Sequence, residues 1–326
     1  MTPLPSGRLD VVVDTDVMNE VDDQFALVWA LLRPDRLNLL ALLACPFGLT
    51  PELFAPDAGL LTELDRRQLV SRLEALGMTP HDLPVRSPAD GVQAAYDELL
   101  RLVALAGIDV PVHLGSPAYL PDATTPVESG AARALIELAH TPREGQLYVV
   151  AIGCATNVAS ALLLDPSIRE HVTVVWTAAY PSFWPYGNAS YNLAQDLPAA
   201  QVLFDSGVPL VYVPGYYVGE ELRVSGPELQ AHVRGVGVLG DYLWDTVREH
   251  PLFQLDRPGA TKVIWDLAPL TYLLDEDACT VRKVCRPRLG DDLLWAPGDG
   301  AMLEMHDLDR DTVFADLYAR LRAAAG

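Results

Sequence analysis

The feature that most constrains this chain is an alternation of short, continuously apolar runs with segments of helical periodicity. Residues 9–13 form a valine-rich run, and residues 24–32, which follow, have apolar side chains at helical spacing. Strands without polar alternation are buried on both faces, which is typical of parallel sheets covered by helices on both sides. The pattern therefore predicts an α/β protein.

The same alternation recurs through the first two thirds of the chain. We predict strands at residues 9–13, 37–45, 110–114, 146–152, 172–177 and 210–213, and helices at 24–32, 94–105, 128–140, 157–164 and 197–205. The sequence contains no internal repeat, and no linker clearly divides it. We therefore expect residues 1–326 to form a single domain around an open, mostly parallel twisted sheet with helices on both faces.

Residues 49–90 do not fit the alternation, because they are rich in proline and glycine around one charged segment. Thr62 followed by Asp65 suggests a helix N-cap, and Gly77 suits a helix stop, so we predict a surface helix over 62–76. A long excursion between a strand and the next helix often forms a lid. We expect 49–90 to be a lid or insertion at the carboxyl ends of the strands, and a solvated decoration is the alternative.

The charge balance is strongly acidic, with 44 acidic against 23 basic side chains and a formal net charge of −21. Such a surface repels phosphate, so nucleic acid is not expected as a partner. Residues 1–10 have no apolar core of the signal-peptide kind, and the longest apolar run, residues 37–49, contains Asn38 and Pro46. The sequence therefore predicts a cytoplasmic protein without a membrane partner.

The cysteines show no zinc-ligand spacing and have apolar neighbours, so we expect buried, reduced thiols. The four are Cys45, Cys154, Cys279 and Cys285.

The densest cluster of candidate functional residues comes directly after the first predicted strand, where residues 14–23 contain five carboxylates. The carboxyl end of a parallel strand is where ligands bind in open α/β sheets. These carboxylates repel one another unless a cation compensates them, and no lysine is near in the sequence. A divalent metal is the natural partner, and calcium tolerates irregular carboxylate geometry better than magnesium. The alternative is that Asp22 caps the following helix and the other carboxylates are solvated.

Asp14-Thr15-Asp16 also invites comparison with haloacid-dehalogenase-type phosphatases, in which the first aspartate is a nucleophile and the second a general acid. That family has Thr or Val where Met18 stands here. It also needs a lysine and a further acidic pair, roles that Lys262 or Lys283 and residues 291–292 would fill only weakly. A phosphatase is therefore the weaker alternative.

The ordered set of motifs resembles the inosine–uridine-preferring nucleoside hydrolase family, in the branch with a D-T-D-x-x-N-E-x-D-D signature. Residues 14–23 carry this signature. The further matching segments are 87–91 (SPADG), 95–99 (AYDEL), 115–116, 126–132, 152–159 (IGCATNVA), 191–200, 207–210 (GVPL) and 265–268 (WDLA). The resemblance spans about residues 10–275, and its ordered combination is more specific than any single piece.

The resemblance implies a Rossmann-like fold and calcium-dependent hydrolysis of the N-glycosidic bond of ribonucleosides to base and ribose. It implies a role in nucleoside salvage and a homodimer or homotetramer. By motif, calcium would be held by Asp16, Asp23, Asp266 and the carbonyl of Ile152. Asp16 would also be the general base for a metal-bound water that attacks C1′.

The resemblance also assigns Asp22 and Asn192 to the sugar. Trp265, beside a predicted metal ligand, is expected to stack on the base. Each has an alternative: a helix N-cap for Asp266, a turn residue for Asn192 and a core residue for Trp265. Thr156 and Asn157 would shape the turn that orients the Ile152 carbonyl.

The chain departs from the family pattern at several sugar-side positions. Ser190 replaces a glutamate, Leu49 stands near an expected asparagine, and Ala178-Ala179 replaces a glycine pair. A metal-binding but catalytically silent homologue is therefore the principal alternative. The group that protonates the leaving base is left open between a tyrosine and ring stacking. The tyrosine candidates are Tyr180, Tyr186, Tyr191, Tyr216 and Tyr217, and the stacking candidates are Trp265, Phe183 and Trp184.

Overall fold

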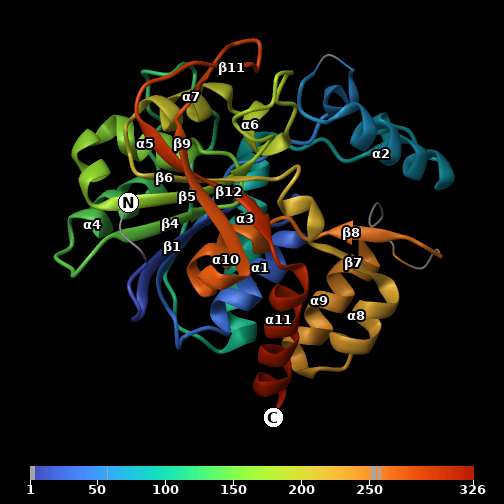
Figure 1. The fold of residues 1–326 in the computed structure, drawn as a ribbon. Helices are drawn as coiled ribbons and strands as arrows, with labels where there is room; N and C mark the ends of the chain where they lie inside the picture. Colours follow the sequence, from blue (N-terminus) through green and yellow to red (C-terminus); the bar gives the residue numbers. More distant parts are fainter. Residues whose placement is uncertain (1–3, 57, 251–254, 256–257) are drawn as a thin grey trace.

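The protein is built around one eight-stranded sheet with the strand order β3-β2-β1-β4-β5-β6-β12-β9. The computed structural model describes residues 4–56, 58–250, 255 and 258–326 (Figure 1). Residues 1–3, in the segment for which we expect no signal peptide, and residue 57 of the predicted lid lie outside the described residues.

All neighbouring strands of the sheet are parallel except β12 and β9, which are antiparallel. The strands of the sheet are β1 (Leu9–Thr15), β2 (Leu37–Ala44), β3 (Val112–His113), β4 (Leu147–Ala151), β5 (Val172–Ala178), β6 (Leu210–Pro214), β9 (Cys279–Cys285) and β12 (Ala301–Leu308). Two small antiparallel pairs join β7 (Arg223–Ser225) to β8 (Thr261–Val263) and β10 (Arg288–Leu289) to β11 (Trp295–Ala296). The mostly parallel α/β architecture is thus confirmed.

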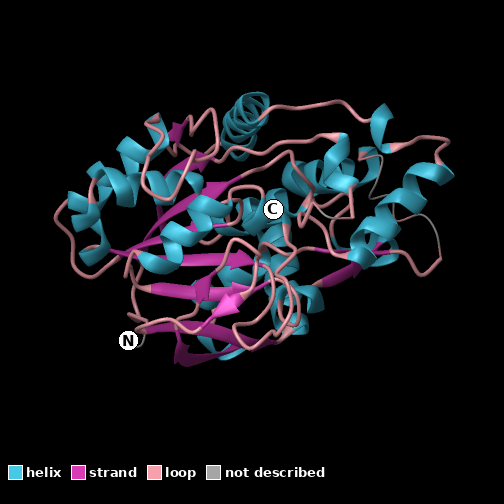
Figure 2. Ribbon diagram, turned by 90° about the horizontal axis from the view of Figure 1, so that it is seen from above, coloured by secondary structure: helices cyan, strands magenta, loops and turns pink. Residues whose placement is uncertain are grey.

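Helices cover both faces of the sheet, as Figure 2 shows from above. One core contains residues of α1 (Asp22–Leu31), α3 (Pro88–Ala106), α9 (Gly237–Glu249), α10 (Leu267–Leu274) and α11 (Arg310–Ala325). The other contains residues of α4 (Gly130–His140), α5 (Thr156–Leu164) and α7 (Leu197–Asp205). Along β1, Val11 and Val13 enter the first core and Val12 the second, which explains why the strand is apolar throughout.

The predicted elements differ from the observed ones mainly at their ends. The helix predicted to start at Ala94 begins at Pro88, because Ser87 and Asp90 form a capping box and proline fits the first helical turn. Only Val112–His113 of the strand predicted at 110–114 pairs in the sheet. The sequence pattern does not predict β9, β12 or α11, which complete the sheet and one of its cores.

The surface helix predicted over 62–76 is α2 (Glu63–Ala75). Thr62 accepts a hydrogen bond from the backbone N–H of Asp65, as expected of an N-cap. At the other end Gly77 has a φ of +71°, and Gly77 and Met78 donate backbone bonds to the carbonyls of Glu74 and Leu73. In Figure 1 this helix stands to one side of the helical layers.

Two short helices remain, α6 (Tyr191–Ala194) and α8 (Gly226–His232). None of the described helices combines the length and the apolar character that a bilayer crossing requires.

Candidate active site

The acidic loop lies at the carboxyl end of β1, where α1 begins. The helix starts at Asp22 itself, its N-cap is Val21, and no side chain caps it. The capping alternative for Asp22 is therefore wrong. Both Asp22 and Asp23 are buried in the first turn of α1, where the backbone N–H groups favour negative charge.

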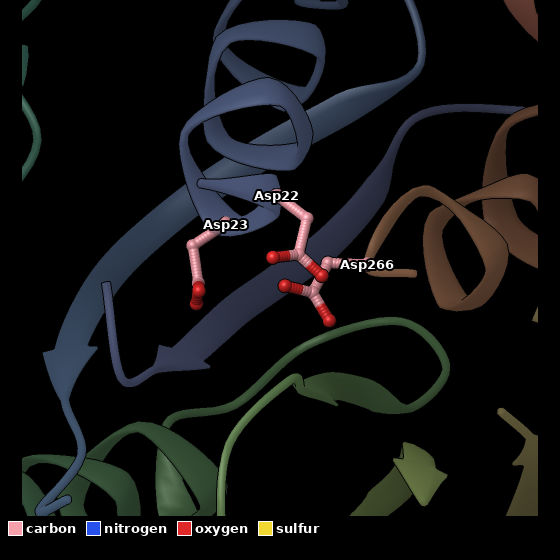
Figure 3. Close-up of side chains that lie close together, drawn as sticks. All are labelled: Asp22, Asp23 and Asp266. Carbon is pink, nitrogen blue, oxygen red and sulfur yellow. The ribbon is translucent and has the colours of Figure 1, made fainter. Parts of the chain in front are cut away.

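Three carboxylates converge above the strand ends, two from α1 and one from the start of α10. Asp22, Asp23 and Asp266 each offer an oxygen, and these oxygens all lie within 4.8 Å of one another (Figure 3). Asp266 occupies the N-cap position of α10, yet its side chain caps no N–H of that fully described helix. The three carboxylates come from segments more than 240 residues apart in the sequence, and the fold brings them into one group.

Burial and mutual repulsion raise the pKa values of this group. The pKa of Asp22 rises to about 6 through burial, although the positive charge of Lys262 opposes the rise. Burial and the charge of Asp22 raise the pKa of Asp23 to about 8. The pKa of Asp266 is raised well above its usual value by burial and by the neighbouring aspartates. A bound cation would relieve both causes.

Asp16 lies beside this group, and its pKa is likewise raised by burial and by the charge of Asp23. Its carboxylate packs against the turn after β4, where a Cβ on Gly153 would lie 2.9 Å from the Asp16 Cγ. Gly153 therefore leaves the space that Asp16 occupies. Asn19 Nδ2 donates to Asp16 Oδ2 at 3.3 Å.

The polar side chains behind the acidic loop connect the strand ends. Asn157 Nδ2 donates to Asp14 Oδ1 at 2.8 Å and to the Ala44 carbonyl at 2.9 Å, which joins the ends of β1 and β2. Thr15 Oγ1 donates to Asp23 Oδ1 at 2.5 Å. These bonds fix the base of the site.

Asn192 lies against the Ile152 carbonyl. Its Nδ2 donates to the carbonyl oxygens of Ile152 at 3.0 Å and of Thr177 at 3.2 Å. Both amide protons are therefore engaged by backbone, and the Oδ1 atom is the acceptor left for a ligand.

Lys262, which precedes Asp266 by four residues, lies beside the carboxylates. Its Nζ is 2.5 Å from Glu20 Oε2 and 3.5 Å from Asp22 Oδ1. The expectation that no lysine is near the acidic loop is therefore wrong, because it considered only neighbours along the chain. The fold brings Lys262 from β8 to residues about 240 positions earlier.

One cavity of about 670 Å³ unites the site. All seven residues that the sequence assigned to the metal or substrate line it: Asp16, Asp22, Asp23, Ile152, Asn192, Trp265 and Asp266. Residues of α2 line it as well, including Asp65 and Gln68, and so does the N-cap residue Thr62. The cavity is therefore lined both by the carboxylates and by residues of the 49–90 segment.

Aromatic rings also line this cavity. Tyr180 stacks between Trp184 and Tyr216, with centroid distances of 4.5 and 4.4 Å, and Trp265 meets Tyr216 edge-on at 5.5 Å. Burial raises the pKa of Tyr180 to about 12, so its phenol is neutral. Of the other suggested rings, those of Phe183, Tyr186 and Tyr217 are exposed.

The positions that depart from the family pattern also have defined places. Ser190 Oγ accepts a hydrogen bond from the Ala179 N–H at 3.0 Å and lines the cavity. Leu49 instead pairs through its backbone with Arg86. Cys45 and Cys154 are buried thiols with their sulfurs 3.4 Å apart, whereas Cys279 is half-buried and Cys285 exposed, so only two of the four fit the burial expected.

Comparison with known proteins defines the class. The sequence profile described as "Inosine-uridine preferring nucleoside hydrolase" matches residues 87–290, so the chain belongs to that family. It is thus an enzyme of the nucleoside hydrolase class, as its motifs suggest, and not a phosphatase. The acidic loop at 14–23 lies before the matched range.

Curated relatives and solved structures agree. The chain is 28% identical to "Probable uridine nucleosidase 2" of Arabidopsis thaliana over 243 residues, 72% of this chain and 68% of that protein. It is 26% identical to "Pyrimidine-specific ribonucleoside hydrolase RihA" of Enterobacter sp. (strain 638) over 299 residues, 86% of this chain and 80% of that protein. Its fold matches a plant nucleoside hydrolase, PpNRh1, with a TM-score of 0.67 at 20% identity over 98% of this chain and all (100%) of the other. It also matches a purine-preferring ribonucleoside hydrolase from Gardnerella vaginalis, with a TM-score of 0.65 at 17% identity over 97% and 99% of the chains.

Proposed function

We propose that the protein hydrolyses the N-glycosidic bond of ribonucleosides with a bound calcium ion. The observation that carries the proposal is the single cavity lined both by converging buried carboxylates and by stacked aromatic rings. A ribonucleoside has the matching polarity, with a sugar rich in hydroxyls at one end and a flat base at the other.

The carboxylates fit a metal ion. Asp22, Asp23 and Asp266 are all buried and offer oxygens that lie within 4.8 Å of one another, so their mutual repulsion favours a bound cation. The oxygen-only donor set suits a hard cation, and calcium accepts irregular carboxylate geometry. Asp16, Asp23, Asp266 and the Ile152 carbonyl would hold it, and when bound it would bind ribose hydroxyls and acidify a water.

The side chains around the sugar then have separate tasks. Asp16 accepts the proton of the attacking water, because it is buried beside the other carboxylates and lines the cavity. Asp22 accepts a hydrogen bond from a ribose hydroxyl. Asn192 does the same through Oδ1, since its amide protons are held by backbone carbonyls. These carboxylates also stabilise positive charge that develops on the ribose ring.

The 49–90 segment acts as a lid over the sugar and base. Supporting this, residues of α2 line the cavity, and Tyr216, one of the stacked rings, donates a hydrogen bond to Asp65 of α2 at 2.6 Å. Helix α2 has only one fully buried side chain, Leu73, as expected of an element that packs loosely enough to move.

The base-release test uses a panel of ribonucleosides with and without chelator. We expect release of free base in calcium and loss of it in chelator, restored by added calcium. Asp23→Asn is expected to lose more than about 100-fold in kcat/KM, since it removes a metal ligand. Asp97→Asn, an exposed carboxylate on α3, is the control and should behave like the wild type. Calcium binding without base release from any ribonucleoside would favour the silent homologue.

The leaving group provides a second test. Tyr216 donates its phenol proton to Asp65 and Tyr191 to the Gly48 carbonyl, so both half-buried tyrosines are engaged by the protein. Stacking supplies only about 1 kcal/mol, less than a placed acid. We therefore expect slow turnover of inosine and uridine and faster cleavage of p-nitrophenyl riboside, whose leaving group needs no proton. Equal rates would reveal an unrecognised acid.

We also propose a cytoplasmic homodimer or homotetramer without nucleic acid or membrane partners, in a nucleoside salvage role. The net charge of −21 supports the absence of a nucleic-acid partner. Light scattering of the purified protein tests the oligomeric state.

A further inference from the structure

Lys262 is a buried cation placed against one member of the carboxylate group. Its side chain is 5% exposed, and Nζ donates to Glu20 Oε2 at 2.5 Å and to the Val263 carbonyl at 2.8 Å. Asp22 Oδ1 lies 3.5 Å away, and this oxygen is buried. The two bonds to Glu20 and Val263 hold the ammonium in place beside Asp22.

Each of the three converging aspartates offers an oxygen to a metal, and these oxygens lie within 4.8 Å of one another. They differ in their other partners. Asp23 Oδ1 accepts a neutral hydroxyl hydrogen bond from Thr15, whereas Asp22 faces the Lys262 ammonium. Among the described residues, Asp22 is therefore the member of this group in ion-pair contact with a fixed positive charge.

We propose that Lys262 is a positioning residue that reserves Asp22 for the substrate and limits how tightly the carboxylate group binds a cation. The inference rests on the proposed function. An ammonium on Asp22 offsets its charge and repels a second cation from it, so that a metal is held by the remaining carboxylates. Asp22 then stays available as an acceptor for a neutral hydroxyl. Glu20 completes the arrangement by fixing the ammonium.

The test measures calcium affinity as well as activity. Lys262→Met removes the charge and keeps a long apolar side chain, Lys262→Arg keeps the charge, and Lys283→Met, the other lysine, is an exposed residue of β9 and serves as control. Calcium titration of the metal-free proteins gives Kd. Ribonucleoside kinetics at saturating calcium give KM and kcat separately.

We expect Lys262→Met to bind calcium about tenfold more tightly, because a nearby positive charge is gone. Its KM should rise more than its kcat falls, because a cation can then bind Asp22 in place of a ribose hydroxyl. Lys262→Arg should restore the wild-type Kd, and Lys283→Met should match the wild type throughout. An unchanged or weaker calcium Kd in Lys262→Met would overturn the inference, because a structural lysine alone would not tighten metal binding.

If Lys262→Met does not fold, Glu20→Gln answers the same question. It leaves the ammonium in place with one fewer counter-charge, so calcium should bind at least about threefold more weakly. An unchanged Kd in this variant would likewise overturn the inference. Wild-type protein that neither binds calcium nor releases base would overturn the proposed function together with this inference. Wild-type activity with an unshifted Lys262→Met Kd would overturn the inference alone.

Discussion

Backbone conformations that are unusual for L-residues occur around the cavity. Met18 in the acidic loop has a φ of +83°, and Ala179 and Tyr217, which line the cavity, have values of +38° and +73°. A side chain in this region of φ is strained by roughly 1–2 kcal/mol. Such strain is maintained only where the surrounding structure fixes the backbone, as it does here at the end of β5.

Ala179 allows a direct test of this strain. Ala179→Gly should leave the free energy of unfolding unchanged or raise it by up to about 1 kcal/mol, because relief of strain offsets the added chain entropy. Ala178→Gly, one residue earlier in β5, should lower it by about 1 kcal/mol. Urea denaturation measures both. Equal losses in the two variants would show that the Ala179 conformation costs nothing.

At the level of single residues, the acidic loop could be predicted because its members are neighbours in the sequence. Asp16, Asp22 and Asp23 need only the strand before them and the helix after them to reach one place. Lys262 could not be assigned in this way, since its approach to Glu20 depends on the packing of segments 242 residues apart. Long-range ion pairs leave no periodic signal in a single sequence.

At the scale of elements, the hydrogen bond from Tyr216 to Asp65 joins α2 to the aromatic residues that line the cavity. We expect Tyr216→Phe to raise KM for uridine by about threefold to tenfold, because a hydrogen bond to a charged group is worth about 1.5–3 kcal/mol and part of it holds α2. Trypsin should also cut faster at Arg67, whose side chain is 65% exposed on α2.

Tyr186→Phe is the control, because the Tyr186 ring is exposed and Tyr186 is not among the residues that line the cavity. It should change neither KM nor the cleavage rate. If Tyr216→Phe also leaves proteolysis of α2 unchanged, the hydrogen bond does not hold the helix, and the lid proposal loses its main support.

Predictability at this scale follows from the local strength of each signal. The strands at the centre of the sheet are buried on both faces, so their apolar runs are unambiguous. By contrast, β9 alternates between exposed and half-buried residues and pairs antiparallel with β12 at the sheet edge. Two short strands, β10 and β11, separate β9 from β12 in the sequence. The sequence pattern of β9 could therefore not be distinguished from that of a loop.

Across the whole molecule, the carboxylate pKa values predict how the metal-free protein responds to pH. The pKa values of Asp22 and Asp23 in the folded state, about 6 and about 8, exceed the unfolded value near 3.9. The folded state therefore binds more protons, and the free energy of unfolding falls as pH rises from about 4 to about 8. Calcium binds the deprotonated forms, so its stabilising effect should grow over the same range.

Thermal unfolding in chelator and in calcium between about pH 5 and pH 8 measures this response. In chelator, Asp23→Asn should flatten the upper part of the decline, because its own titration is removed. A metal-free melting temperature that rises with pH would contradict the carboxylate assignment.

The shortage of lysine has a practical consequence for chemical labelling. The chain has two lysines, and Lys262 is buried in its ion pairs, so Lys283 on β9 is the exposed lysine side chain. In the sheet, β4, β5, β6 and β12 lie between β9 and β1, from which the acidic loop extends. An amine-reactive dye or resin would therefore attach at the sheet edge or at the terminal amine. A sample immobilised through Lys283 would present its molecules in one orientation.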